Sequence, residues 1–159
     1  MHLATFLSFS KQRKIKSYQV ETHWYQKYNH LVSHTENAPT PRCLDGFNDG
    51  HELCLLLEDL STRGFTQRIY NTSWKEVRLV LRWLAYFHAQ FMHEDPDGLW
   101  ACGTYWHLAT RPEELHNIRH SKLHTIAPFL DARLRTGRFQ TFVHGDAKLA
   151  NFCFRPDIV

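Results

Sequence analysis

The sequence contains no hydrophobic run near the roughly 20 apolar residues that cross a bilayer. Its first residues, MHLATFLSF, have no basic segment before the apolar run and no small-residue cleavage site after it, so no signal peptide is expected. The four cysteines, Cys43, Cys54, Cys102 and Cys153, form no CxxC pair, which argues against a zinc knuckle or a redox motif. These absences predict a cytoplasmic protein with reduced thiols.

The chain also has little excess of charge of either sign, because its net charge is only +3 over 159 residues. The single basic cluster, SKQRKIK, contains Lys11, Arg13, Lys14 and Lys16. Such a cluster could contact phosphates or anionic lipid, although a solvated helix face is the more common outcome. We therefore expect neither nucleic acid nor a membrane as a partner. An apolar fraction of 43% predicts a folded, globular chain.

Residues 17–32, SYQVETHWYQKYNHLV, place apolar side chains three and four positions apart, which predicts an amphipathic helix. Two prolines in NAPTPRC then stop this helix. In CLDGFNDGHELCLLLEDL, the Asn-Asp-Gly turn at residues 48–50 separates two short runs and predicts a β-hairpin. The second run, residues 53–57, is continuously apolar, so we expect a strand buried on both faces.

Ser73 and Glu76 form a capping-box pattern that opens the longest predicted helix. The apolar stripe of this helix should lie in the middle of a helical core and contains Trp74, Val77, Leu81, Leu84, His88 and Phe91. His88 is expected to be a core histidine rather than a ligand. Further helices are predicted over residues 112–125 and 127–136, followed by a short strand, FQTFV. This order of patterns predicts an α+β fold with its strands early in the chain.

The segment FVHGDAKLANF carries the polar groups that phosphoryl transfer to a hydroxyl requires. Asp146 can accept or orient the hydroxyl proton, Asn151 can offer a neutral oxygen to Mg²⁺ on the phosphates, and Lys148 can offset negative charge. His144 is expected to support the loop through hydrogen bonds rather than to transfer protons. The alternatives to these roles are a capping Asp with a turn Asn, and an ordinary exposed Lys.

HGDAKLAN resembles the HGDxxxxN motif of the aminoglycoside phosphotransferase and choline-kinase-like families, and it is similar to the HRDxKxxN loop of protein kinases. The Gly after the His favours the enzymes that act on small molecules. LAYFHAQF, at residues 84–91, is similar to a helix of the ecdysteroid-kinase-like (CHK-kinase-like) subgroup. With the hinge and helix resemblances described next, the likeness covers most of the chain.

The resemblance implies a protein-kinase-like, two-lobe fold, with a partial N-lobe over residues 1–60 and a partial helical C-lobe over residues 61–159. It implies ATP and Mg²⁺ as cofactors and a small-molecule hydroxyl as the acceptor. LLLEDL resembles the strand and hinge that hold adenine through backbone hydrogen bonds, which implies adenine binding at Glu58, Asp59 and Leu60.

SYQVETHWYQKY is similar to the helix whose glutamate pairs with a phosphate-anchoring lysine, and Glu21 matches that glutamate. A plain surface glutamate is the alternative. Residues 3–9 contain no lysine that a strand upstream of Glu21 would carry. Asp157 follows Asn151 too closely to be the second metal-binding aspartate, which sits on a hairpin of roughly 10 residues or more.

The sequence therefore resembles the middle of a kinase, truncated at both ends. The predicted function is ATP-dependent phosphoryl transfer to a small-molecule hydroxyl. The alternative is a catalytically inactive kinase-like protein that acts at most as a binding module. Surfaces exposed by truncation are expected to cause self-association.

Twelve histidines suggest a third possibility, a metal-binding helical protein. His116, His120 and His124 are spaced by four and would share a helix face. No carboxylate or cysteine completes a site at a neighbouring turn, so a solvated face is the preferred interpretation.

Overall fold

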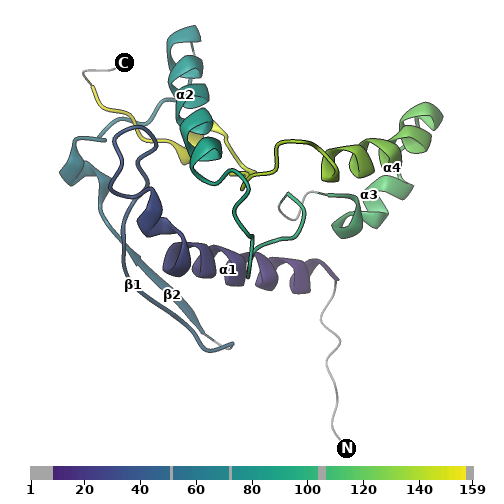
Figure 1. Ribbon diagram of the computed structural model, residues 1–159, viewed down its shortest axis with the longest axis horizontal. Helices are drawn as coiled ribbons and strands as arrows, with labels where there is room; N and C mark the ends of the chain where they lie inside the picture. The colour runs from purple at the N-terminus through teal and green to yellow at the C-terminus, as the bar shows by residue number, and fades with distance from the viewer. Residues whose placement is uncertain (1–8, 51, 72, 104–106, 157–159) are drawn as a thin grey trace, which may run out of the picture.

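The structure is a computed structural model, and it describes residues 9–50, 52–71, 73–103 and 107–156. The elements, in chain order, are helix α1 (Phe9–Lys27), the 3₁₀ turn η1 (Asn29–Leu31), strands β1 (Cys43–Asn48) and β2 (Leu53–Leu57), the 3₁₀ turn η2 (Leu60–Arg63), helix α2 (Trp74–Gln90), the 3₁₀ turn η3 (Leu108–Thr110), helices α3 (Pro112–His116) and α4 (Ser121–Arg135), and the 3₁₀ turn η4 (Leu149–Asn151). Helix α1 runs along one side of the molecule, with the hairpin near its C-terminal end and α3 and α4 toward its N-terminal end (Figure 1).

These elements form an α+β fold with the strands early, as the sequence predicts. The two-lobe arrangement and a domain boundary at residue 60 stay predictions. None of the described helices is both long enough and apolar enough to span a bilayer.

Helix α1 differs from its predicted bounds at both ends. It begins at Phe9 rather than at residue 17, and it ends at Lys27 rather than at residue 32. The basic cluster therefore lies on the first turns of α1, where Lys11 and Lys14 are exposed. Basic side chains are good helix formers, so the helix extends beyond the amphipathic stretch from which it was predicted.

Asn29 fixes the chain between α1 and β1. This residue is buried, and its side-chain amide donates to the Thr40 hydroxyl at 2.9 Å and to the Pro41 carbonyl at 3.0 Å. Its amide oxygen accepts the backbone N–H of Cys43 at 3.1 Å, where β1 begins. A buried amide with every polar atom bonded holds a turn that has no regular structure of its own.

The predicted hairpin is present, with β1 and β2 antiparallel and a bulge between Cys43 and Asp45. At its turn, Gly50 has a φ of 90°, and its N–H donates to the side-chain oxygen of Asn48 at 3.0 Å. A left-handed backbone costs glycine nothing, which is why the Asn-Asp-Gly signal located the turn.

Strand β2 is not buried on both faces, contrary to the prediction from its apolar run. Leu53 and Leu56 are 38% and 55% exposed. Helix α1 contacts the hairpin, where the side-chain amide of Gln26 donates to the Gly46 carbonyl at 2.8 Å. In the described residues the sheet has only these two strands, so it lacks the neighbours that would bury β2 fully.

Helix α2 begins at the predicted capping box. The Ser73 hydroxyl accepts the N–H of Lys75 at 3.2 Å, and the Glu76 carboxylate accepts the N–H of Ser73 at 2.6 Å. The prediction that this helix is the longest was wrong, since α2 has 17 residues and α1 has 19.

The predicted apolar stripe of α2 is only partly correct. Trp74 and Leu81 are 79% and 56% exposed, whereas Phe87 and Phe91 are buried. The buried face thus lies around the second half of the helix, where α1 and the loop after α4 supply packing partners. His88 is half-buried, and burial lowers the pKa of its imidazole.

The core is aromatic. Phe91 and Phe142 stack with ring centroids 4.7 Å apart, and Tyr28 meets Phe142 edge-on at 4.9 Å. Phe87 joins them from α2, 5.0 Å from Phe91. These contacts join the C-terminal ends of α1 and α2 to the segment before residue 144, so the core directly positions the loop that carries Asp146.

The two helices predicted over residues 112–125 and 127–136 have different bounds. Helix α3 is short (Pro112–His116), and α4 (Ser121–Arg135) continues through Pro128. The prediction of a strand at FQTFV was wrong: residues 139–143 form no strand. This segment instead packs through Phe142, without a neighbouring strand in the described part of the chain to pair with.

The chain leaves the core at His93 and returns to the same place at Gln140. The N–H of His93 donates to the Gln140 carbonyl at 2.9 Å. One residue on, the Thr141 hydroxyl donates to the His88 carbonyl at 2.6 Å. Helices α3 and α4 lie within residues 94–139, the segment between these two points, and stand apart from α2 in Figure 1. Arg13 of α1 contacts this segment, where its guanidinium donates to the Thr110 carbonyl at 2.8 Å.

Candidate active-site cleft

The loop of residues 144–151, hereafter the Asp146 loop, brings its three predicted polar residues together. The Asn151 amide nitrogen donates to Oδ2 of Asp146 at 2.9 Å and to the Asp146 carbonyl at 2.7 Å. The Lys148 ammonium lies 2.8 Å from the same Oδ2. Gly145 has a φ of 76°, a left-handed conformation that turns the chain just before Asp146 and favours glycine.

The carboxylate of Asp146 is exposed and strongly paired. The hydrogen bond from Lys148, followed by that from Asn151, holds its pKa below the usual value of an aspartate. Both donors prefer the ionised form. The carboxylate is therefore ionised at neutral pH and able to accept a proton or to orient a hydroxyl.

His144 supports this loop, as predicted. Its Nδ1 accepts the backbone N–H of Asp146 at 3.2 Å. The ring is stacked on Phe152 with centroids 5.9 Å apart, and Trp83 meets it edge-on at 5.7 Å. Burial lowers the pKa of His144, partly opposed by the charge of Asp146. A neutral imidazole keeps the lone pair that accepts this hydrogen bond.

A cleft of about 1490 Å³ opens beside the Asp146 loop. Four of the predicted site residues line it, namely Glu21, Leu60, Asp146 and Asn151. These positions come from α1, the start of η2 and the Asp146 loop, so the cleft joins segments far apart in the sequence. Lys148, Glu58 and Asp59 are not among the described residues that line it.

The Glu58 side chain points into an ion pair instead of the cleft. Its carboxylate is 5% exposed and accepts from the Arg42 guanidinium at 3.0 Å and from Arg63 at 3.4 Å. Burial raises the pKa of Glu58, but the hydrogen bonds from Arg42 and then Arg63 outweigh it and lower the pKa overall. The carboxylate of Asp59 accepts the Ser61 N–H at 2.9 Å and caps η2.

The backbone of this predicted hinge has two groups to offer. The Glu58 N–H donates to the Arg42 carbonyl, and the Asp59 carbonyl accepts from Thr62. Within the described residues, no turn, loop or cap hydrogen bond uses the Glu58 carbonyl or the Leu60 N–H. An acceptor and a donor two residues apart match what one edge of an adenine ring requires.

Glu21 is exposed on α1. Burial raises the pKa of Tyr25 to about 12, and the negative charge of Glu21 contributes to this rise. Lys14 and Lys16 are residues of the same helix rather than of a neighbouring strand. Residues 3–8 and Asp157, which were compared with kinase groups at the sequence level, lie outside the described residues.

The donors present fit Mg²⁺ only as a partner of bound phosphates. Asp146 offers a carboxylate and Asn151 an amide oxygen, and no group of three or more His, Cys, Asp or Glu side chains suited to a metal occurs in the described part of the chain. Mg²⁺ keeps several waters and uses one or two protein oxygens when phosphates supply the rest.

The histidine hypothesis is not supported by the described residues. His116 ends α3, His120 caps α4, and His124 lies inside α4, so no single helix face carries all three. All three side chains are exposed, in agreement with the preferred interpretation of a solvated surface.

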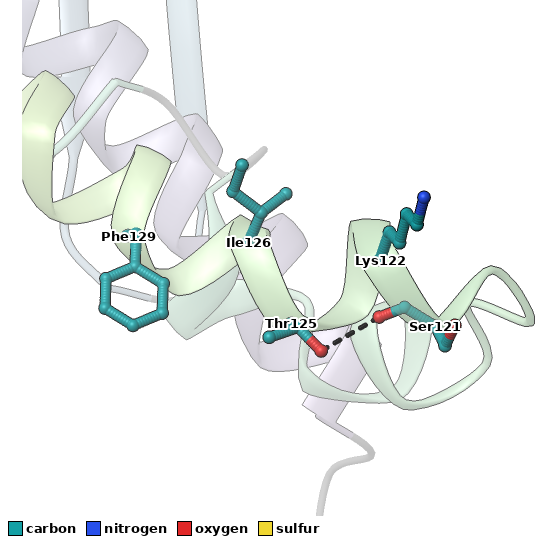
Figure 2. Close-up of a pocket in the computed structure, with 5 residues that line it drawn as sticks. All are labelled: Ser121, Lys122, Thr125, Ile126 and Phe129. Carbon is teal, nitrogen blue, oxygen red and sulfur yellow. Dashed lines mark hydrogen bonds between the residues drawn. The ribbon is translucent and has the colours of Figure 1, made fainter.

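A second, shallower depression lies on α4 (Figure 2). It is lined by exposed residues, namely Ser121, Lys122, Thr125, Ile126 and Phe129. The Thr125 hydroxyl donates to the Ser121 carbonyl at 2.9 Å, which is a bond within the helix. One helix face without converging polar groups is a poor ligand site, so the candidate site is the cleft.

Comparison with known families gives one match. Residues 9–96, more than half of the chain, match the ecdysteroid kinase-like family. The chain therefore belongs to the ecdysteroid kinase-like family, and the kinase-like resemblance predicted from its sequence is confirmed. The matched segment contains Glu21 and the hinge, whereas the Asp146 loop lies after it. Comparison with curated proteins and with solved structures gave no match.

Two cleft residues were missed at the sequence level. Trp83 joins the Asp146 loop to the chain before β1, since its indole N–H donates to the Pro39 carbonyl at 3.0 Å. Arg68 donates to the Ala150 carbonyl at 2.8 Å. Both contacts join residues far apart in sequence. No local sequence pattern predicts that a tryptophan on a helix face or an arginine in a loop will make such a contact.

Proposed function

We propose that this chain transfers the γ-phosphoryl group of ATP to a hydroxyl of a small molecule, with Asp146 as the base. The observation that carries the proposal is the hydrogen bond between Asp146 and Asn151 beside a cleft that extends to Leu60. Membership of a kinase-like family supports the reaction class. The acceptor is proposed only as a small-molecule hydroxyl.

Asp146 has one oxygen available for the acceptor. Its Oδ2 is bonded by Lys148 and Asn151, which leaves Oδ1 to accept a hydrogen bond from the substrate hydroxyl. As the hydroxyl oxygen bonds to the γ-phosphorus, its proton passes to Asp146 and the bond from phosphorus to the β,γ-bridging oxygen breaks, which releases ADP. In this proposal Lys148 fixes the carboxylate and offsets nearby negative charge.

The nucleotide would lie across the cleft. Leu60 lines the cleft, so its N–H, together with the Glu58 carbonyl two residues earlier, would hold adenine at that end, and the amide oxygen of Asn151 would face the phosphates. Mg²⁺, when bound with ATP, would neutralise charge on the phosphate oxygens. Glu21 would face the same cleft from α1, without an assigned lysine partner.

The test uses the purified 159-residue chain with ATP, Mg²⁺ and a panel of aminoglycosides, choline-like amines and sterols, and measures ADP release and phosphorylated product. We expect slow turnover, below about 1 per second, because the Asn151 amide oxygen would be the metal's one assigned protein ligand while Asp146 holds the acceptor hydroxyl. Asp146→Asn should reduce kcat by about 100-fold or more.

Glu113→Gln is the matched control, because it neutralises an exposed carboxylate on α3 away from the cleft. It should leave turnover unchanged. Product formation that persists unchanged in Asp146→Asn would overturn the assignment of the base. ATP binding without turnover on any acceptor would favour the alternative, a kinase-like binding module.

A further inference from the structure

The cleft contains few positive charges for a site proposed to bind a polyphosphate. Among the described residues that line it, the arginines and lysines are Arg68 and Arg135. Arg135 is already neutralised, since its guanidinium lies 2.7 Å from the carboxylate of Asp131. Four carboxylates, Glu21, Glu94, Asp131 and Asp146, also line the cleft; Asp131 is paired with Arg135 and Asp146 with Lys148, which leaves Glu21 and Glu94 in the lining with Arg68. An anionic ligand therefore depends strongly on Arg68 for charge complementarity.

Arg68 is held beside the Asp146 loop by two sets of contacts. Its Nη1 donates to the carbonyl of Ala150 at 2.8 Å. The neighbouring Gln67 forms an antiparallel bridge with Phe154, in which each backbone N–H donates to the other carbonyl, at 3.0 and 2.9 Å. The bond holds the guanidinium at Ala150, which directly precedes Asn151 in the sequence. Asn151 is the residue that we propose faces the phosphates.

Most of the donors of Arg68 are left for a ligand. A guanidinium has five N–H donors, and the side chain is exposed, with the Ala150 carbonyl as its one hydrogen-bond partner in the described residues. No carboxylate lies within 4.0 Å of it in this part of the chain. A fixed, unneutralised guanidinium is well suited to two hydrogen bonds with phosphate oxygens.

We propose that Arg68 binds the phosphate groups of the nucleotide in the cleft. The proposal rests on the proposed function and adds to it the positive charge that the sequence did not locate upstream of Glu21. Its bond to the Ala150 carbonyl prepares the guanidinium for this role by limiting the side-chain freedom that is lost on binding. A guanidinium would bind a free polyphosphate by the same chemistry, so the test distinguishes a nucleotide from a free polyphosphate as the ligand.

The test measures dissociation constants by calorimetry for three ligands, namely ATP with Mg²⁺, adenosine and tripolyphosphate. The proteins are the unmodified chain, Arg68→Gln, Arg68→Lys and the control Arg78→Gln. Arg78 is an exposed residue of α2 that does not line the cleft. Arg78→Gln changes the net charge by the same amount as Arg68→Gln. A thermal melt of each variant checks that the fold is retained.

Arg68→Gln should weaken ATP and tripolyphosphate by about tenfold or more, since hydrogen bonds to a charged group are lost. Adenosine should bind as before, within about twofold, because it carries no phosphate. Arg68→Lys should recover part of the loss, because it restores the charge without the paired donors. Arg78→Gln should bind all three ligands like the unmodified chain.

Equal ATP affinity in Arg68→Gln and the unmodified chain would overturn the inference while leaving the proposed function standing. A loss for adenosine as large as that for ATP would also overturn it, because Arg68 would then act through the fold. Tripolyphosphate binding that depends on Arg68, in a chain that binds neither adenosine nor ATP, would support an anion site at Arg68 and count against the proposed function.

Discussion

Asn151 donates to Asp146 twice, to the backbone carbonyl at 2.7 Å and to the carboxylate Oδ2 at 2.9 Å. Both bonds use the amide nitrogen, so the amide oxygen points elsewhere. One short loop thereby fixes a carboxylate and leaves a neutral oxygen beside it. This is the arrangement that the reaction proposed above needs, and several measurements follow from it.

Lys148→Met should raise the pKa of Asp146. The Lys148 ammonium is the main reason that this pKa is lowered, so its removal makes protonation easier. The acid limb of the pH–rate profile should move to higher pH, with little change above neutrality, where Asp146 is ionised in both proteins. A carboxyl-carbon NMR titration of Asp146 gives the same answer without activity.

Lys122→Met is the control for this prediction, because Lys122 is exposed on α4 and distant in sequence from the Asp146 loop. It should leave the titration of Asp146 unchanged. An unshifted Asp146 titration in Lys148→Met would show that the 2.8 Å pair does not control the charge of this carboxylate.

Mg²⁺ alone should bind weakly, with a dissociation constant above about 1 mM, because the site offers one carboxylate and one amide oxygen. With ATP present, Mg²⁺ should bind more tightly in the unmodified chain than in Asn151→Ala. Calorimetry with and without nucleotide measures both. Tight binding of the metal alone would require protein ligands beyond these two.

Glu58→Ala should lower the free energy of unfolding by about 1–3 kcal/mol, because it leaves Arg42 and Arg63 without their shared carboxylate. Chemical denaturation at neutral pH measures the change, and Glu52→Ala, at an exposed hairpin position, is the control. An unchanged unfolding free energy would mean that solvent replaces the ion pair at no cost.

This stabilisation should also depend on pH. The pKa of Glu58 is lower in the folded chain than in the unfolded one, so the unfolded state binds the proton more readily. The contribution is present above the unfolded-state pKa, which is about 4.3, and it is lost as pH falls through the lower folded-state pKa. The difference between the unmodified chain and Glu58→Ala should therefore shrink in acid.

The chain should self-associate through the exposed apolar face of α4. Phe129 and Leu134 are 71% and 78% exposed, and Leu123, Ile126 and Leu130 are also exposed. Sedimentation velocity should show a concentration-dependent mass that Phe129→Glu shifts toward the monomer. The control His124→Glu places the same carboxylate at an exposed position of α4 outside the depression of Figure 2 and should not have this effect. A monomer at every concentration would contradict the prediction.

Local signals predicted local structure well. The Asn-Asp-Gly turn and the Ser73 capping box each involve residues within one turn, and both are found where expected. Asp146, Lys148 and Asn151 came together because five residues of loop hold them. FQTFV failed as a strand because strand formation needs a neighbour, which composition cannot supply.

Packing decided what local signals could not. The buried aromatic face of α2 centres on Phe87 and Phe91 rather than on Trp74 and Leu81, since the aromatic side chains that pack on it meet the second half of the helix. The contact between Arg68 and Ala150 spans 82 positions of sequence and depends on how the whole chain closes. Such long-range contacts are set by the fold and have no motif.

The bond between His93 and Gln140 has a consequence for how the molecule opens. Because the chain departs and returns at one point, α3 and α4 can melt while the Phe91–Phe142 stack stays intact. The part of the cleft wall that Leu130 and Leu134 provide would then form and unfold independently of the Asp146 loop. If α3 and α4 do open in this way, the space offered to an acceptor would vary while the groups proposed to carry out the chemistry stay in place.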